Sequence, residues 1–216
     1  VIEGSGTGRL FINLGKKVEG RSTGGPAKIA VLTSALFGSM SGSSSSNVFT
    51  TGSFTIPMMK KRGYKASFAG GVETAASVGG QSAPPIMGAG AFVMAEITGV
   101  PYTDIIVAAV IGSLCYFVMI FVTVHFEARK LGLKGIDESE LPSWSEVLKD
   151  IHLLIPIGVL ITLLLMRFSP TYAALVSIAV TFLTSWLRQH TRIGFKKALE
   201  ILINAGRNAV LIAIAC

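Results

Sequence analysis

The sequence predicts an all-α integral membrane protein, and three observations support this fold class. Half of the 216 residues are apolar and only 14% are charged, whereas about a quarter of the residues in a typical soluble domain are charged. The mean hydropathy is high, at +0.62. The basic residues lie in short blocks between long uncharged stretches, which is the pattern of cytoplasmic loops between membrane spans.

Two of the predicted spans share one stretch without Lys or Arg, from Ala66 to Phe126. Because a helix needs about 20 residues to cross the hydrocarbon core, this stretch can cross twice, at 66–98 and 102–126. The turn at 99–104, which overlaps the start of the second span, contains Asp104 and no basic residue, and this favours the non-cytoplasmic face. The remaining segments are predicted as a cytoplasmic connector, two further spans and a basic connector, at 127–150, 151–168, 171–187 and 188–216.

The segment before these spans, residues 27–59, is predicted to be a re-entrant helical hairpin. Its two apolar arms, 27–40 and 48–59, are about 12 to 14 residues long. At 1.5 Å per residue each arm reaches only about 18 to 21 Å, which is too short to cross. Basic blocks flank both outer ends and place them in the cytoplasm, so the tip at 41–47 lies at mid-membrane depth. Residues 1–26 are predicted to be a cytoplasmic, amphipathic lead-in.

The span at 66–98 is predicted to be broken near its middle, at 77–85. A Pro inside a helix costs about 3 kcal/mol and a Gly about 1 kcal/mol, and this stretch holds two of each. Non-helical backbone at membrane depth is tolerated only where protein buries it or a wet cavity adjoins it. Many secondary transporters build their sites from such discontinuous helices, so we expect the hairpin tip and the break to meet.

The residue types at these two interruptions favour a hard monovalent cation. They offer hydroxyl, amide and freed carbonyl oxygens, which suit Na⁺ better than a softer metal. No carboxylate lies in either interruption, and this favours sodium over a proton relay, which usually needs Asp, Glu or His. The oxygens come from Ser43, Ser44, Ser45, Asn47, Thr50, Gly79 and Gly80.

Several other classes of protein are disfavoured. The basic blocks are not gathered with aromatic residues as a nucleic-acid surface requires. The three His residues share no metal-ligand spacing, and Cys115 and Cys216 suggest neither a disulfide framework nor a zinc site. An intramembrane serine protease is the enzyme alternative, because Ser41 lies near half-depth, but no His lies at a matching depth to activate its hydroxyl. We therefore expect no enzyme and no organic cofactor.

Some interpretations stay open on the residues alone. The serine run at 41–46 could be a flexible linker, and the break could be a structural proline kink. Glu73 lies inside the broken span, where a carboxylate costs about 2.5 to 3.5 kcal/mol, so it is either a functional group or a cavity-facing or helix-pairing residue. Residues 144–150, like 196–205, could form a surface helix or a solvated loop.

The strings SGSSSSNVFTTGSFTIP, GGQSAPPIMGAGAFVMAE and LPSWSEVLK resemble the large membrane subunit of tripartite ATP-independent periplasmic (TRAP) transporters. In particular, they are similar to long fused permeases that work with TAXI-type binding proteins. The resemblance covers essentially the whole chain. It implies an elevator-type transporter built from two inverted repeats, of which this chain resembles the first, with the next repeat starting within 188–216.

The resemblance also implies a function and a site. It implies sodium-driven uptake of an organic acid across the inner membrane, with a periplasmic solute-binding protein, a small membrane subunit and lipid as partners. A channel and a non-transporting scaffold module remain alternatives. Residues matched to the family's metal site are Ser41, Gly42, Ser43, Ser44, Asn47, Gly79, Gly80 and Pro84, and the expected substrate-binding residues are Asn47, Thr50, Thr51 and Gln81.

Overall fold

The computed structural model describes residues 7–186, 194, 198–201 and 203–206, and every regular element within them is helical. The predicted all-α class is therefore confirmed. The chain divides into two compact units, Phe11–Leu148 and a second unit that contains Lys149–Cys216. The predicted connector at 188–216 falls mostly outside the described residues.

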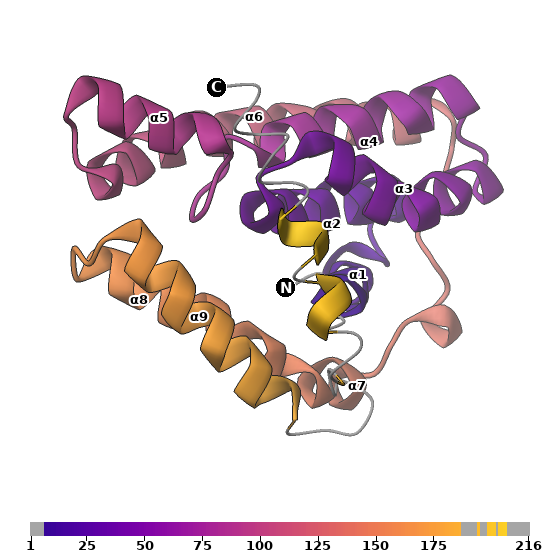
Figure 1. Ribbon diagram of the computed structural model, residues 1–216. Coiled ribbons are helices and arrows are strands. Elements are labelled where there is room, and N and C mark those ends of the chain that lie inside the picture. The colour runs from indigo at the N-terminus through magenta and orange to yellow at the C-terminus, as the bar shows by residue number, and fades with distance from the viewer. Residues whose placement is uncertain (1–6, 187–193, 195–197, 202, 207–216) are drawn as a thin grey trace. The chain divides into compact units, whose positions relative to one another are not determined.

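The first unit is centred on three helices that pack against one another, α2 (Gly25–Ser41), α3 (Ser44–Lys61) and α4 (Ala66–Gly80) (Figure 1). The preceding helix α1 covers Thr7–Glu19. The buried apolar residues between the helices are mostly small, and small residues let helices in a membrane approach closely. The core consists of Ala27, Ala30, Val31, Met59, Tyr64, Ala69, Val72, Ala76, Val124 and Ala128.

The turn between α2 and α3 is shorter than the predicted tip at 41–47. Helix α2 ends at Ser41 and is capped by Gly42, which has φ 62° and donates its N–H to the carbonyl of Gly38. Ser43 then caps α3, because its side chain accepts the backbone N–H of Ser46, as serine commonly does at a helix start. The serine run therefore forms the first turn of α3, and only two residues separate the helices.

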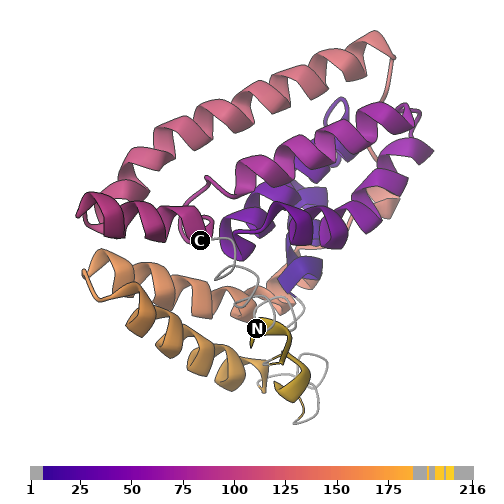
Figure 2. The same ribbon diagram turned by 45° about the horizontal axis from the view of Figure 1, so that its top comes forward.

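Helix α4 stops at Gly80 and the chain resumes as α5 (Ala89–Thr98), so a non-helical loop spans residues 81–88. Helix α6 (Tyr102–Lys130) follows and runs alongside α4 in the opposite direction (Figure 2). Its 29 residues span about 43 Å at 1.5 Å per residue. Among the described helices, α6 alone is long and apolar enough to cross a membrane unbroken.

Two short helical segments follow α6 along the chain. A 3-10 turn covers Glu138–Glu140 and helix α7 covers Trp144–Lys149. Residues 144–149, for which the sequence left helix and loop open, are therefore helical over six residues.

The second unit contains an antiparallel hairpin of α8 (Ile155–Leu165) and α9 (Pro170–Ser185). Helix α8 is shorter than the span predicted at 151–168, because a 3-10 turn at Ile151–Leu154 precedes it and the α-helix begins next to Pro156, a residue favoured in the first turn. Ser169 caps α9 by accepting the N–H of Tyr172 at 3.3 Å.

Candidate functional site

The hairpin tip and the loop that breaks α4 from α5 lie in direct contact. The backbone N–H groups of Ile86 and Met87 donate to the carbonyl of Ser39 at 3.1 and 3.3 Å. The Gln81 amide donates to the Ser44 hydroxyl at 3.1 Å. Two interruptions more than thirty residues apart in the sequence thus form one structure.

Four helix ends converge at this contact. Helices α2 and α4 end there, and α3 and α5 begin there. Carbonyls at a helix C-terminus carry partial negative charge and attract cations, whereas N–H groups at an N-terminus attract anions. The junction can therefore hold a cation and a carboxylate side by side.

The hairpin residues expected to bind a metal lie at the tip and are half-buried, namely Ser41, Gly42, Ser43 and Ser44. Gly42 packs directly against the Met87 carbonyl. A side chain at Gly42 is excluded by this contact and by its positive φ, which favours glycine. Met87 itself is buried with φ 57°, and its part in the junction was missed from the sequence.

The expected metal ligands on the other side, Gly79, Gly80 and Pro84, have packing roles. Gly79 packs against the ring of Tyr116, and a Cβ on Gly80 would lie 2.6 Å from Cα of Gly38. The Gly79 carbonyl accepts both the backbone N–H and the hydroxyl of Ser82, at 3.1 and 2.9 Å. The Gly80 carbonyl accepts the backbone N–H of Ala83 at 3.2 Å and keeps a second lone pair for a ligand. Pro84 is half-buried, and its bond to Pro85 is cis.

The four expected substrate-binding residues separate into two places. Gln81 is exposed at the junction and Thr50 is half-buried. Asn47 and Thr51 are buried. The Asn47 amide donates to the Ser34 carbonyl at 2.8 Å, and Thr51 donates to the Asn47 carbonyl at 2.8 Å. Thr51 also contacts Ser34 of α2 and Glu73 of α4, so both side chains join helices inside the bundle.

Asn47 and Thr51 belong to a buried network around Glu73, whose side chain is fully enclosed between α2, α3 and α4. The hydroxyls of Ser34 and Ser77 donate to Glu73 Oε1 at 2.6 and 3.4 Å. The Thr51 hydroxyl contacts Oε1 and shares its single proton between Oε1 and the Asn47 carbonyl. The Thr55 hydroxyl contacts Oε2 and also the Thr51 carbonyl of its own helix at 3.0 Å. None of the ion pairs among the described residues includes Glu73.

Glu73 lies between paired helices, which is one of the alternatives that the sequence left open. The roles of Ser34 and Thr55 were missed. A signal for them existed, because Thr51 and Thr55 lie four residues apart and so share one face of α3, as Glu73 and Ser77 do on α4. What the spacing did not show is that the two faces meet.

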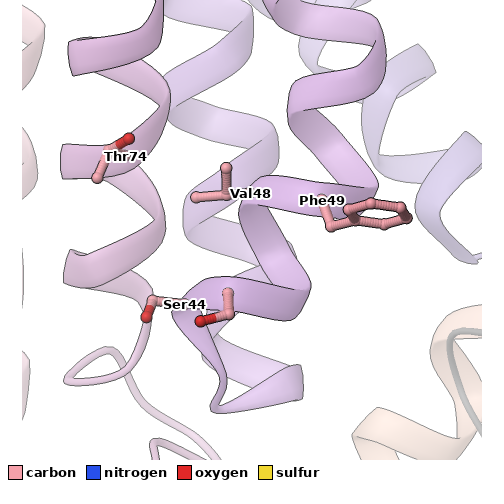
Figure 3. A pocket seen from close by; sticks show the side chains of 5 residues that line it. Ser44, Val48, Phe49 and Thr74 are labelled. Atoms are coloured by element: carbon pink, nitrogen blue, oxygen red, sulfur yellow. The ribbon is translucent and has the colours of Figure 1, made fainter.

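An open recess of about 390 Å³ lies beside the junction. Figure 3 shows Thr74 of α4 facing Ser44 and Val48 of α3, with the ring of Phe49 at the edge. The recess therefore offers hydroxyl groups and an apolar wall next to the start of α3.

A membrane unit in which a helical hairpin contacts the break of another helix has the architecture of secondary transporter sites. The family model described as "Tripartite ATP-independent periplasmic transporter, DctM component" matches residues 1–216. The chain belongs to this family, which is a family of transporter permeases and not of enzymes.

Individual relatives agree with this assignment. The sialic acid TRAP transporter large permease SiaM of Vibrio cholerae is 28% identical over 79% of this chain and 40% of its own length. The C4-dicarboxylate permease DctM of Pseudomonas aeruginosa is 26% identical over 96% of the chain and 48% of its length. The isethionate permease DctMQ of Oleidesulfovibrio alaskensis is 36% identical over 37% of the chain and 13% of its length. The chain thus spans less than half the length of these relatives.

Proposed function

We propose that this chain is part of a permease in the bacterial inner membrane that takes up an organic acid together with sodium. A periplasmic binding protein delivers the acid, and a small membrane subunit, fused or separate, completes the transporter. The names of the three relatives support the substrate class, because sialic acid, C4-dicarboxylates and isethionate are all organic anions.

The contact between the hairpin tip and the break is the observation that carries this proposal. Two helix C-termini and several neutral oxygens meet there without a carboxylate, and such oxygens suit a hard cation. We assign the sodium ligands to the hydroxyls and carbonyls of Ser41, Gly42, Ser43, Ser44, Gly80 and Pro84. Gly79, which was also expected, is a packing residue because its carbonyl accepts two hydrogen bonds from Ser82. Asn47 is a positioning residue, because its amide joins α3 to α2.

The organic acid binds on the other side of the same junction. The first turns of α3 and α5 present N–H groups that attract a carboxylate. Gln81 and Thr50 lie nearest the surface among the expected substrate-binding residues, and the recess beside Ser44 provides room for the rest of the molecule. Thr51 supports this wall from the interior through its bond to Asn47.

Transport follows an elevator mechanism in which the hairpin, α4 and the bound solute move as one unit against the rest of the permease. The energy is sufficient. One charge moved through 100 mV supplies about 2.3 kcal/mol, and a tenfold sodium ratio adds about 1.4 kcal/mol. Two sodium ions supply roughly 7 kcal/mol in total, enough for about a 10⁵-fold gradient of a neutral solute.

Counterflow in proteoliposomes tests transport against its alternatives. The complete permease with its small subunit and binding protein should exchange labelled for unlabelled organic acid, and an inward sodium gradient should drive net uptake. A channel would conduct without counterflow, and a scaffold module would do neither. Uptake that is equal in sodium and in choline chloride would contradict sodium coupling.

The site assignment is tested by Ser44→Ala beside Ser53→Ala. Both changes remove one hydroxyl from α3, but Ser44 bonds to Gln81 at the junction whereas Ser53 is exposed and bonds to its own helix. Losing one ligand should lower the sodium affinity of uptake about tenfold in Ser44→Ala, as a lost hydrogen-bonding group does. Ser53→Ala should match the wild type, and equal behaviour of the two variants would refute the assignment.

A further inference from the structure

Glu73 and one hydrogen-bond partner on each of the other two helices lie the same number of residues from the junction. Glu73 is seven residues before Gly80, where α4 ends. Its partner Ser34 is seven residues before Ser41, where α2 ends, and its partner Thr51 is seven residues after Ser44, where α3 begins. At 1.5 Å per residue this depth is about 10 Å, so Glu73 does not touch an ion bound at the junction.

The network around Glu73 supplies hydrogen bonds to both oxygens of its carboxyl group but supplies no opposite charge. Ser34, Thr51, Thr55 and Ser77 contribute hydroxyls, and hydroxyls carry no net charge. No ion pair among the described residues compensates it. A charge enclosed in protein without a partner is costly, and the cost falls when an opposite charge arrives nearby.

We propose that Glu73 is the counter-charge of the sodium site, acting through the electrostatic field from about two helical turns away and not as a ligand. This inference rests on the proposed sodium coupling and adds a residue that determines cation affinity. It explains why an ion site built from neutral oxygens lies above a fully buried carboxylate that forms no ion pair in the described part of the chain.

The expected size of the effect follows from the distance. At an effective dielectric constant of about 20, one unit charge changes the binding of another about 10 Å away by about tenfold. The C-terminal ends of α2 and α4 add their partial negative charges at the junction itself. Glu73 therefore sets the affinity for the ion, while the ligands at the tip set its position.

The test is the sodium dependence of uptake by the complete permease in proteoliposomes, with sodium-dependent thermal stabilisation of the purified protein as a second measurement. Glu73→Gln keeps the size and removes the charge, and it should raise the half-saturating sodium concentration about tenfold. Glu73→Asp keeps the charge, and Thr55→Val keeps it while removing one hydroxyl contact. Both should stay within about threefold of the wild type, because a change in distance of about 1 Å alters the field little.

A pair of double variants separates charge from folding. Thr55→Asp with Glu73→Gln returns the negative charge to the same place from α3, because the two side chains are in contact. Thr55→Asn with Glu73→Gln has the same shape without the charge. The first should bind sodium about tenfold more tightly than the second, and this comparison holds even where Glu73→Gln alone does not fold.

The outcomes are distinguishable. Equal sodium affinity in Glu73→Gln and the wild type, or in the two double variants where Glu73→Gln does not fold, overturns the counter-charge role and leaves sodium coupling intact. An equal loss of sodium affinity in Glu73→Gln, Glu73→Asp and Thr55→Val also overturns the counter-charge role, because disturbed packing would then be the cause. A wild-type protein without any response to sodium refutes both this inference and the proposed function.

Discussion

The α2–α4 bundle and the α8–α9 hairpin both turn hydroxyl groups inward, but they use them differently. In the bundle, Ser34, Thr51 and Thr55 bond across helices to Glu73, and Thr51 and Thr55 do so in addition to bonds with carbonyls of their own helix. In the hairpin, Thr181 donates to the carbonyl of Ser177 in its own helix at 2.7 Å. The same kind of local bond is made by Thr184 and Ser185, and by the exposed Thr162.

The two patterns have different structural consequences. A hydroxyl bonded to its own helix is satisfied whatever helix lies beside it, whereas a bond across helices fixes which helices pair and in which register. The two regions also differ in how much apolar surface they expose. Every residue of α2 is at least half-buried, whereas α8 and α9 expose large apolar side chains such as Leu165, Leu175 and Leu183. Hydrogen bonds between its own helices determine how the bundle packs, whereas the hairpin exposes an apolar surface.

The strongest expected contrast between the two regions comes from Gly38→Ala and Gly158→Ala. A Cβ on Gly38 would lie 2.6 Å from Cα of Gly80 and 2.8 Å from Nδ2 of Asn47, whereas nothing lies within 4 Å of one on Gly158. Gly38→Ala should lower the free energy of unfolding by about 2 to 3 kcal/mol, the cost of overpacking. Gly158→Ala should leave it unchanged or raise it by up to about 1 kcal/mol, because alanine favours the helix.

Both changes can be measured by reversible unfolding of the complete permease in mixed detergent micelles. Their matched chemistry makes each the control of the other, since the same methyl group is added to a helix in both. A similar loss in the two variants would mean that α8 is packed as closely as the bundle, and the comparison would then fail.

The next effect in size comes from Thr55→Val beside Thr181→Val. The Thr55 hydroxyl bonds to the Glu73 carboxylate in another helix as well as to the Thr51 carbonyl in its own helix, whereas Thr181 bonds to a carbonyl of its own helix. Removing a hydrogen bond to a charged group costs about 1.5 to 3 kcal/mol, so Thr55→Val should destabilise by about that amount. Thr181→Val should stay within about 0.5 kcal/mol of the wild type. An equal loss of stability in the two variants, measured by the same unfolding experiment, would show that a hydrogen bond between helices stabilises the fold no more than one within a helix.

The sequence predicted the features that depend on local backbone preferences. Helix α4 stops at Gly80 and the chain becomes helical again at Ala89, close to the Gly and Pro residues that disfavour helix wherever they occur. The all-helical class followed from composition, which is also independent of tertiary contacts. The serine run was interpreted as the tip, but Ser43 provides a cap and so lets the following serines begin α3.

The features that depend on pairing between helices were not predicted. Asn47 and Thr51 were expected to bind substrate on the strength of the family resemblance. In the structure they face α2 and Glu73 instead. Spacing within one helix shows which residues share a face, but it does not show which helix that face meets. The short α8 is a similar case, because the 3-10 turn before it is not specified by apolar composition.

The smallest effect is expected for an ion pair that joins separate elements, as the Glu73 network does, but lies near the surface. Arg62 donates to Glu140 at 2.6 Å, with 28% of the Arg62 side chain and 60% of the Glu140 side chain exposed. Exposed pairs contribute about 0.2 to 1 kcal/mol and are weakened by salt. A double-mutant cycle with Arg62→Ala and Glu140→Ala should therefore give a coupling energy of about 0.5 kcal/mol or less, decreasing further at about 1 M salt, where the screening length is about 3 Å. A coupling energy as large as the stability lost in Thr55→Val would mean that a contact between two elements stabilises the fold equally whether it is exposed or buried. The buried network around Glu73 would then have no larger effect on stability than a surface ion pair.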